Sequence, residues 1–400
     1  MQIQIKMAQS QFSRKYEIFL IIFLGMLSAF GPFVTDMYLP TLPSMTEVFH
    51  TTTALVQMGL ATSMLGLAVG QIFFGPLSDK FGRKTILVSA MSLFSLSTIA
   101  SIYSTDIEFF NFCRFLQGLG GSGGLVLSRS VASDCYSGRE LAKILVIIGA
   151  VNGIAPVTAP VIGGLVSEAI GWQGIFWTLF AIGALILVMC TVFKESHTKE
   201  RRYGGSIMSL MIKFPQLFKM KYFVLYTLTY AFTCGVLFSY ISSASFIIQN
   251  KFGFSELGFA VIFGLNAVGI AIGSGLSLKF HKIKNAVLFG AIGMMTCSLM
   301  QSVVYMIMPF FLPYEVFTFT MLVSVGIILP SSTTIAMDEG REMAGSASAI
   351  FGASGFLFGS IVTPLVGLGD IMTTTFLLLI GCSILTVILT IIARKQIVNV

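Results

Sequence analysis

The sequence has few charged residues, and this shortage excludes most classes of soluble protein. Asp, Glu, Lys and Arg make up only 10 % of the 400 residues, whereas a soluble domain usually carries about 25 %. Hydrophobic residues make up 55 %, and the mean hydropathy is +0.90. Such a chain cannot cover a folded core with a water-compatible surface. We therefore expect an all-α integral membrane protein.

Residues that bind metals or form disulfides are also scarce. The six cysteines are scattered without a CxxC pair, and the three histidines fall in or near predicted loops. The chain contains no HExxH motif, and no Ser/His/Asp arrangement lies in an apolar segment. The net charge is +7, but the basic residues do not form one stripe as nucleic-acid binding requires. We expect no enzyme, no metal, no cofactor and no nucleic-acid partner.

Long apolar runs separated by short polar segments are the main feature that is present. Each run is long enough for a membrane-spanning helix, which needs about 20 residues. The first run follows three basic residues, and we interpret it as a retained span rather than a signal peptide. The twelve predicted spans lie near 17–45, 52–77, 85–103, 107–133, 141–167, 173–193, 221–247, 257–279, 285–307, 314–337, 343–367 and 373–393.

The basic residues between the spans predict the orientation of the chain. If the spans alternate in direction, 21 of the 24 Lys and Arg residues lie on one side. Loops rich in Lys and Arg stay in the cytoplasm. We therefore expect both termini to lie in the cytoplasm, which requires an even number of spans.

The only long connection divides the chain into two halves of six spans each. We expect six-helix bundles at residues 1–193 and 221–400, joined by a cytoplasmic linker at 194–220. Residues 77–81 match 276–280 at the same position in the two halves. This similarity favours two parallel repeats with a binding site at their interface.

Two ionisable residues fall inside predicted spans. Asp36 lies in the first span between Pro32 and Pro40, and Arg114 lies in the fourth span. Charged side chains are costly in hydrocarbon, so each is a functional candidate. Burial favours the protonated form of a carboxyl group, whereas a nearby guanidinium favours its ionised form. We expect Asp36 to bind and release a proton as its distance from Arg114 changes.

A fixed ion pair between Asp36 and Arg114, which holds two spans together, is the alternative. Arg129 lies nearer the cytoplasmic end of the fourth span, and we interpret it as an interfacial anchor. In the second half, Glu315 and Asp338 fall at predicted span ends. We therefore expect proton chemistry in the first half and uncharged contacts from the second.

Prolines and small residues mark the fifth predicted span. It contains Pro156 and Pro160, followed by Gly163 and Gly164. Prolines kink helices, and faces of small residues let helices approach closely. The span can serve in static packing or in movement between conformations. Asn152, on the same span, can bond to its own helix or face a ligand.

Several of these motifs resemble those of one transporter family. Residues in the loop between the second and third spans resemble a signature of the major facilitator superfamily; they are Gly75, Asp79, Gly82, Arg83 and Lys84. Arg114-x-x-Gln117-Gly118-x-Gly120 resembles its span 4 signature. Pro160-x-x-Gly163-Gly164 resembles the end of its antiporter signature, and Thr35–Pro40 a span 1 signature of drug exporters. Together with Ala344–Ala349, the set is most similar to the Bcr/CflA drug–proton antiporters.

The resemblance implies twelve helices in two six-helix bundles of the bacterial inner membrane. It also implies export of small amphipathic molecules in exchange for protons. It implies a proton gradient as the energy source, with substrate, protons and lipid as partners of a monomer. Asp36 and Arg114 are the expected proton-coupling residues, and the loop and span 5 motifs are the expected conformational elements. The expected substrate contacts are Phe33, Tyr38, Gln117, Asn152, Tyr240 and Phe356.

Two other functions remain open at this point. The same fold can serve one physiological cargo, such as a siderophore or a sugar. A membrane sensor or scaffold that transports nothing is the third possibility, although no appended soluble domain is predicted.

Overall fold

A computed structural model describes residues 13–203 and 214–395 of the chain, and all its regular structure is helical in these ranges. The first half contains α1 (Arg14–Ser28), α2 (Phe30–Asp36), α3 (Leu42–Val48), α4 (Thr53–Phe81), α5 (Arg83–Ile102), α6 (Ile107–Cys135) and α7 (Gly138–Val192). The second half contains α9 (Phe214–Lys219), α10 (Lys221–Phe246), α11 (Glu256–Ser277), α12 (Ile283–Ile307), α13 (Phe311–Glu339), α14 (Ala344–Val366) and α15 (Ile371–Lys395).

The helices account for the twelve predicted membrane passages. Ten helical stretches in the described ranges are long and apolar enough to cross a membrane. One of them, residues 143–192, has non-helical backbone angles at Ile170 and Gly171 and therefore makes two passages. The twelfth is α6, which is 29 residues long but less apolar than the others. The prediction of an all-α protein with twelve passages is confirmed.

Two prolines explain why the first passage is broken. A proline lacks a backbone N–H, and its ring clashes with the carbonyl four residues earlier. For Pro32 that residue is Ser28, where α1 ends, and for Pro40 it is Asp36, where α2 ends. A short 3₁₀ turn at Leu39–Thr41 then leads into α3. Asp36 thus stands at an interruption of the membrane-spanning helix.

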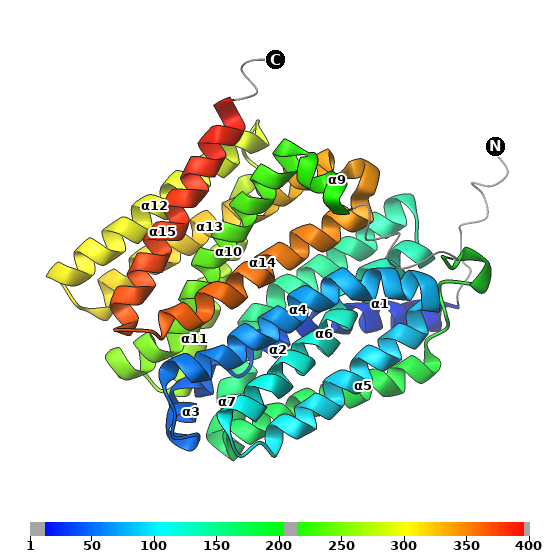
Figure 1. Cartoon of the computed structure of the whole chain (residues 1–400), viewed down its shortest axis with the longest axis horizontal. Helices are drawn as coiled ribbons and strands as arrows, with labels where there is room; N and C mark the ends of the chain where they lie inside the picture. Colours follow the sequence, from blue (N-terminus) through cyan, green and yellow to red (C-terminus); the bar gives the residue numbers. More distant parts are fainter. Residues whose placement is uncertain (1–12, 204–213, 396–400) are drawn as a thin grey trace.

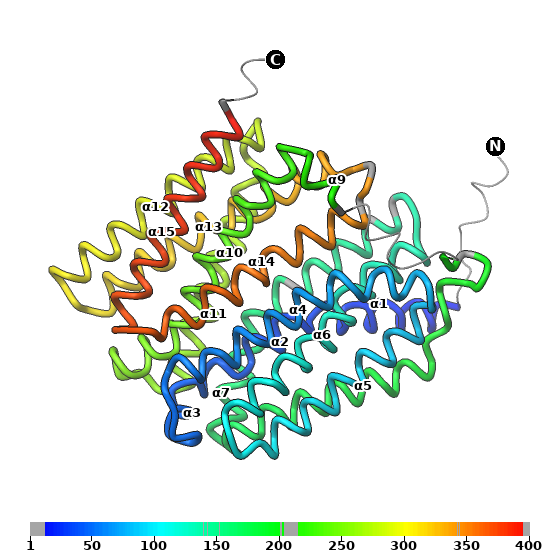
Figure 2. The backbone as a smooth tube through the Cα atoms, viewed as in Figure 1, coloured from blue at the N-terminus to red at the C-terminus, as the bar shows by residue number. Residues whose placement is uncertain are grey.

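The helices pack as two bundles that lie side by side (Figure 1). We call α1–α7 the first bundle and α9–α15 the second bundle; α4 with α14, and α7 with α11, form the main contacts between them. The start of α1 and the end of α15 lie on the same side of the molecule (Figure 2), which we call the termini face. The opposite face contains the turns near Thr52 and Phe254. The linker prediction at 194–220 stays a prediction, because residues 204–213 lie outside the described part.

The bundles touch at the opposite face and separate toward the termini face. At the opposite face, Gln57 Nε2 donates to the Ser242 carbonyl at 3.2 Å, and Gln249 Nε2 donates to the Pro40 carbonyl at 2.8 Å. Toward the termini face lies a cavity of about 590 Å³ between α4, α6 and the start of α14. The molecule is therefore closed on one side and open on the other.

Candidate functional site

Arg114 is fully buried inside the first bundle. Its Nη2 donates to the Val34 carbonyl at 2.7 Å and to the Ser63 hydroxyl at 3.2 Å, and its Nη1 donates to Gln117 Oε1. Its Nε donates to the Gly59 carbonyl at 3.4 Å. Burying a charge is unfavourable unless hydrogen bonds replace its hydration. Here neutral oxygens from three helices surround the guanidinium.

Aromatic rings cover the faces of the same guanidinium. Its central carbon lies 4.2 Å from the centre of the Tyr38 ring and 5.6 Å from that of Phe176. A desolvated cation–π contact of this kind contributes about 2 kcal/mol. Tyr38 was expected to contact substrate, but the structure places it fully buried against Arg114.

Asp36 lies in the same bundle and is only 4 % exposed. The Thr35 hydroxyl donates to its Oδ1 at 2.7 Å. None of the ion pairs within residues 13–203 and 214–395 includes Asp36 or Arg114. The fixed ion pair between these two residues is therefore absent from this conformation. Arg114 is connected to α2 through the Val34 carbonyl, two residues before the carboxyl group.

The other predicted contacts in the first half and on α14 differ in their burial. Gln117 is fully buried, and its Nε2 donates to Thr98 Oγ1 on α5 at 2.7 Å, so it lies inside the first bundle rather than on an open surface. Phe33 and Phe356 are partly exposed. The side chain of Asn152 lies outside the described part of the structure.

Tyr240 belongs to a buried polar cluster in the second bundle. Asn266 Nδ2 donates to Tyr240 Oη at 2.9 Å and to Glu315 Oε1 at 2.6 Å. The expectation of uncharged contacts from this half stays a prediction, but the cluster contains an acid, Glu315. The single amide in the apolar α11 and the acid in the second turn of α13 were visible in the sequence. Their contact was not, because 49 residues separate them.

The loop motif forms an ion-pair cluster at the termini face. Arg83 Nη1 lies 2.6 Å from Asp79 Oδ1, and Arg83 Nε lies 2.8 Å from Asp134 Oδ2. Gly82 joins α4 to α5 with φ of +97°, and a Cβ there would lie 2.5 Å from Arg202 Nη2. Glycine meets both demands, since it alone adopts this backbone angle freely and has no side chain.

The segment after α7 completes this cluster. Glu195 accepts hydrogen bonds from the backbone N–H groups of Arg83 at 2.9 Å and Lys84 at 3.2 Å. Lys84 Nζ in turn donates to the Phe193 carbonyl at 2.7 Å. Anionic groups are favoured at a helix N-terminus because its first N–H groups lack intrahelical partners. The chain after α7 is thereby held against the start of α5.

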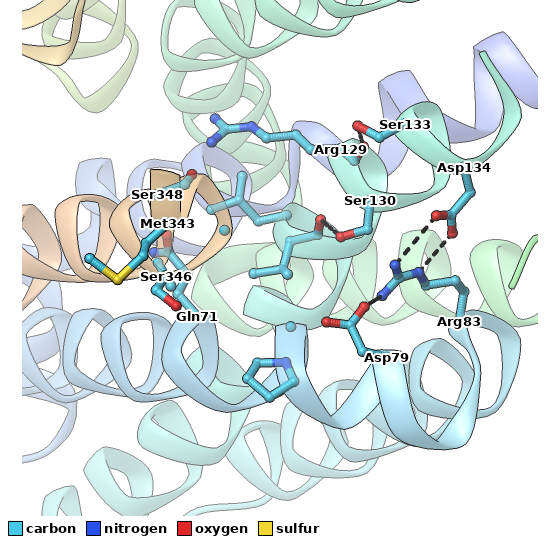
Figure 3. Close-up of a pocket in the computed structure, with 16 residues that line it drawn as sticks. Gln71, Asp79, Arg83, Arg129, Ser130, Ser133, Asp134, Met343, Ser346 and Ser348 are labelled. Atoms are coloured by element: carbon cyan, nitrogen blue, oxygen red, sulfur yellow. Dashed lines mark hydrogen bonds and ion pairs between the residues drawn. The ribbon is translucent and has the colours of Figure 1, made fainter. Parts of the chain in front are cut away.

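The cavity at the termini face borders the same cluster (Figure 3). Gly75, Asp79 and Arg83 line it from one side. Arg129 extends from α6 toward the segment of α14 that carries Ser348 (Figure 3). No ion pair within the described ranges includes Arg129, and the residue is exposed. It therefore presents a charged group to the opening between the bundles.

The span 5 motif packs against both bundles. A Cβ on Gly163 would lie 1.8 Å from the Met37 carbonyl, directly after the break at Asp36, and one on Gly164 would lie 3.3 Å from Ala260 of α11. Pro156 and Pro160 lie within the continuous helix; the backbone of α7 departs from helical angles at Ile170 and Gly171.

Comparisons with known proteins match most of the chain. A family model described as the Major Facilitator Superfamily matches residues 18–364. The uncharacterized MFS-type transporter YdgK of Bacillus subtilis (strain 168) is 34 % identical over 362 residues, covering 89 % of this chain and 90 % of that protein. The bicyclomycin resistance protein homolog of Haemophilus influenzae is 28 % identical over 357 residues, covering 88 % and 90 %. The chloramphenicol resistance protein of Pseudomonas aeruginosa is 29 % identical over 272 residues, covering 66 % and 62 %.

A solved structure shares the same arrangement of helices. The partially occluded inward open conformation of the xylose transporter XylE from E. coli superposes with a TM-score of 0.73 at 14 % identity, covering 94 % of this chain and 97 % of that one. At this identity the similarity concerns the fold alone.

Proposed function

This chain belongs to the major facilitator superfamily, and from that membership we propose that it is a proton-coupled antiporter that exports small amphipathic molecules. It is a multi-pass membrane transporter and not an enzyme. The names of the bicyclomycin and chloramphenicol resistance relatives support drug-like substrates. Export, proton coupling and this substrate class together form the proposal.

The termini face is the cytoplasmic face in this proposal, and the membrane is the bacterial inner membrane. The distribution of basic residues supports this orientation, because 21 of the 24 Lys and Arg residues fall on that side of the predicted spans. The bacterial relatives support the inner membrane. The cavity of about 590 Å³ then faces the cytoplasm. This conformation accepts substrate from inside the cell, and the protein works as a monomer.

Asp36 is the observation that carries the proposal. Its carboxyl group is buried, has the Thr35 hydroxyl as a partner and stands where α2 ends. A rearrangement of α2 against α6 changes its distance from the Arg114 charge, and a nearby positive charge favours release of the proton. Substrate arrival in the open cavity favours this release, and renewed protonation from the opposite face resets the site.

One proton supplies enough energy for useful export. Moving one elementary charge contributes about 2.3 kcal/mol per 100 mV, and each unit of pH difference adds about 1.4 kcal/mol. Under both gradients a single proton sustains a substrate gradient of roughly 10²–10³-fold.

Proton release during transport tests the proposal. Inside-out vesicles from an efflux-deficient host are given a proton gradient, and bicyclomycin or chloramphenicol is added while a fluorescent dye reports internal pH. We expect the wild type to dissipate part of the gradient and to raise resistance in cells. Asp36→Asn should abolish both effects, because the amide cannot exchange a proton. Asp338→Asn, at an exposed helix end, is the matched control and should behave like the wild type.

Two results would contradict the proposal in different ways. An unchanged response in Asp36→Asn would place the proton site elsewhere. No response of the wild type to any compound of a chemically varied library, with unchanged drug resistance, would favour a dedicated physiological cargo or a protein that does not transport.

A further inference from the structure

The polar cluster in the second bundle contains acceptors without donors. Asn266 Nδ2 already donates to Tyr240 Oη and Glu315 Oε1. The remaining oxygens, Asn266 Oδ1 and Glu315 Oε2, are inaccessible to solvent and have no hydrogen-bond partner among the described residues. Asn266 itself is fully buried. Each such group destabilises the fold unless a donor satisfies it.

No positively charged side chain in the described ranges pairs with either of these two oxygens. Glu315 belongs to none of the ion pairs found in the described ranges. The titratable groups that interact with it are the phenols of Tyr240 on α10 and Tyr314 on α13. From α12, Tyr305 faces Tyr314, and α11 contributes the neutral Asn266. The surroundings of the carboxyl group are therefore uncharged.

A proton on the Glu315 carboxyl group fits this set of acceptors. A protonated carboxyl group has an O–H donor in addition to its acceptor oxygen. A hydrogen on Oε2 turns that atom into a donor within the cluster that holds the unpartnered acceptor Asn266 Oδ1, while Oε1 keeps the bond from Nδ2. We propose that Glu315 is a second proton-binding site, located in the second bundle and held by Asn266.

The position of the cluster fits access from the opposite face. Glu315 lies four residues after Phe311, where α13 begins at that face, and Tyr240 lies six residues before the end of α10 at the same face. In the proposed orientation, on which this step rests, protons enter from this side. The transporter then has one proton-binding carboxyl group in each bundle, Asp36 and Glu315, so up to two protons can move per cycle.

Infrared spectroscopy of the purified full-length protein tests Glu315 without any substrate. A protonated carboxyl group has a C=O stretching band that is separate from the bands of ionised carboxylates and disappears as the pH rises. We expect Asp36→Asn to retain such a band at neutral pH, and Asp36→Asn combined with Glu315→Gln to lose it.

Glutamine keeps one donor and one acceptor in place of the acid, so the bundle should fold. Glu140→Gln in the Asp36→Asn background is the matched control and should keep the band, because Glu140 is exposed and pairs with Lys143.

The spectra separate this inference from the proposed function. If Asp36→Asn has no protonated-carboxyl band at neutral pH, Glu315 is ionised and the inference is wrong, whether or not the protein transports drugs. A carboxylate band that shifts with added NaCl or KCl would show a bound metal cation instead and would also overturn it. A band that persists without transport would support the second site and contradict only the export proposal. Should the double variant fail to fold, the single variant Glu315→Gln decides the matter, because its band should be weaker than that of the wild type at the same pH.

Discussion

Arg114 brings a full charge into the first bundle and pairs with no carboxylate of the residues that the structure describes. Its hydrogen bonds go to two carbonyls, a hydroxyl and an amide, and Tyr38 covers one face of the guanidinium. The planar guanidinium group of arginine can donate to acceptors that lie in several directions, whereas the ammonium group of lysine is compact and strongly hydrated. The residue therefore orders the interior of the first bundle.

Arg114→Lys should therefore lower the stability of the protein. A lysine ammonium cannot reach acceptors on all sides, so at least one charged hydrogen bond is lost at about 1.5–3 kcal/mol. Thermal unfolding in detergent, followed by tryptophan fluorescence, should show a clearly lower midpoint. Arg129→Lys on the same helix is the control and should leave the midpoint nearly unchanged, because Arg129 is exposed. Equal midpoints for the two variants would mean that the fork geometry of Arg114 contributes nothing.

At the scale of the elements, α4 and α6 lie so close together that only glycine fits where their backbones meet. A Cβ on Gly118 would lie 2.0 Å from the Ser63 carbonyl, and one on Gly66 would lie 2.2 Å from the Phe115 carbonyl. Such small-residue contacts replace the hydrophobic driving force that is missing between helices in lipid. They also bring Ser63 within reach of Arg114. The packing of two helices thus sets the geometry of the polar site.

Gly118→Ala should force α4 and α6 apart. Adding a methyl group to a fully packed contact costs about 1–3 kcal/mol, so the thermal midpoint and the yield of folded protein should both fall. Gly149→Ala in α7 is the matched control, because no atom lies within 4 Å of a Cβ built there. The comparison uses size-exclusion chromatography after heating. Unchanged folding of Gly118→Ala would show that the two helices can separate freely.

At the scale of the whole molecule, the two bundles are held together on one side and separated on the other. Gln57 and Gln249 cross the contact at the opposite face, while the cavity opens at the termini face. A transporter that alternates between two openings needs contacts that differ between the states. These two side-chain amides stabilise the conformation seen here.

Gln57→Leu combined with Gln249→Leu should shift the molecule toward closure of the termini face. Each lost hydrogen bond is worth about 1 kcal/mol, so together they change the population ratio roughly 30-fold if the other state lacks both bonds. Spin labels at positions 133 and 346, which line the cavity, should show shorter distances in a background without native cysteines. Gln301→Leu, whose amide bonds to Thr318 inside the second bundle, should leave the distances unchanged. Equal distances in all variants would contradict the role of the two amides.

Local sequence was sufficient to predict the membrane passages and the exceptional residues within them. Runs of apolar side chains identify spans because water-free hydrocarbon admits only helices with internally bonded backbones. The two prolines mark the break beside Asp36 because each acts on a residue four positions away. The side-chain arrangement was not predictable in this way. Gln117 faces α5, Arg114 bonds to the Val34 carbonyl, and Glu315 meets Asn266 through contacts between helices.

Amino-acid order alone therefore established that this chain crosses a membrane twelve times and buries an acid and an arginine. Those properties depend on the solvent preference of each side chain and on bonds within a single helix. Only the packed bundles decided that the acid and the arginine do not pair, that one end of the molecule is open, and that a second carboxyl group lacks a donor. Each of these results depends on which faces of distant helices meet, and that choice is made by the fit of all helices together.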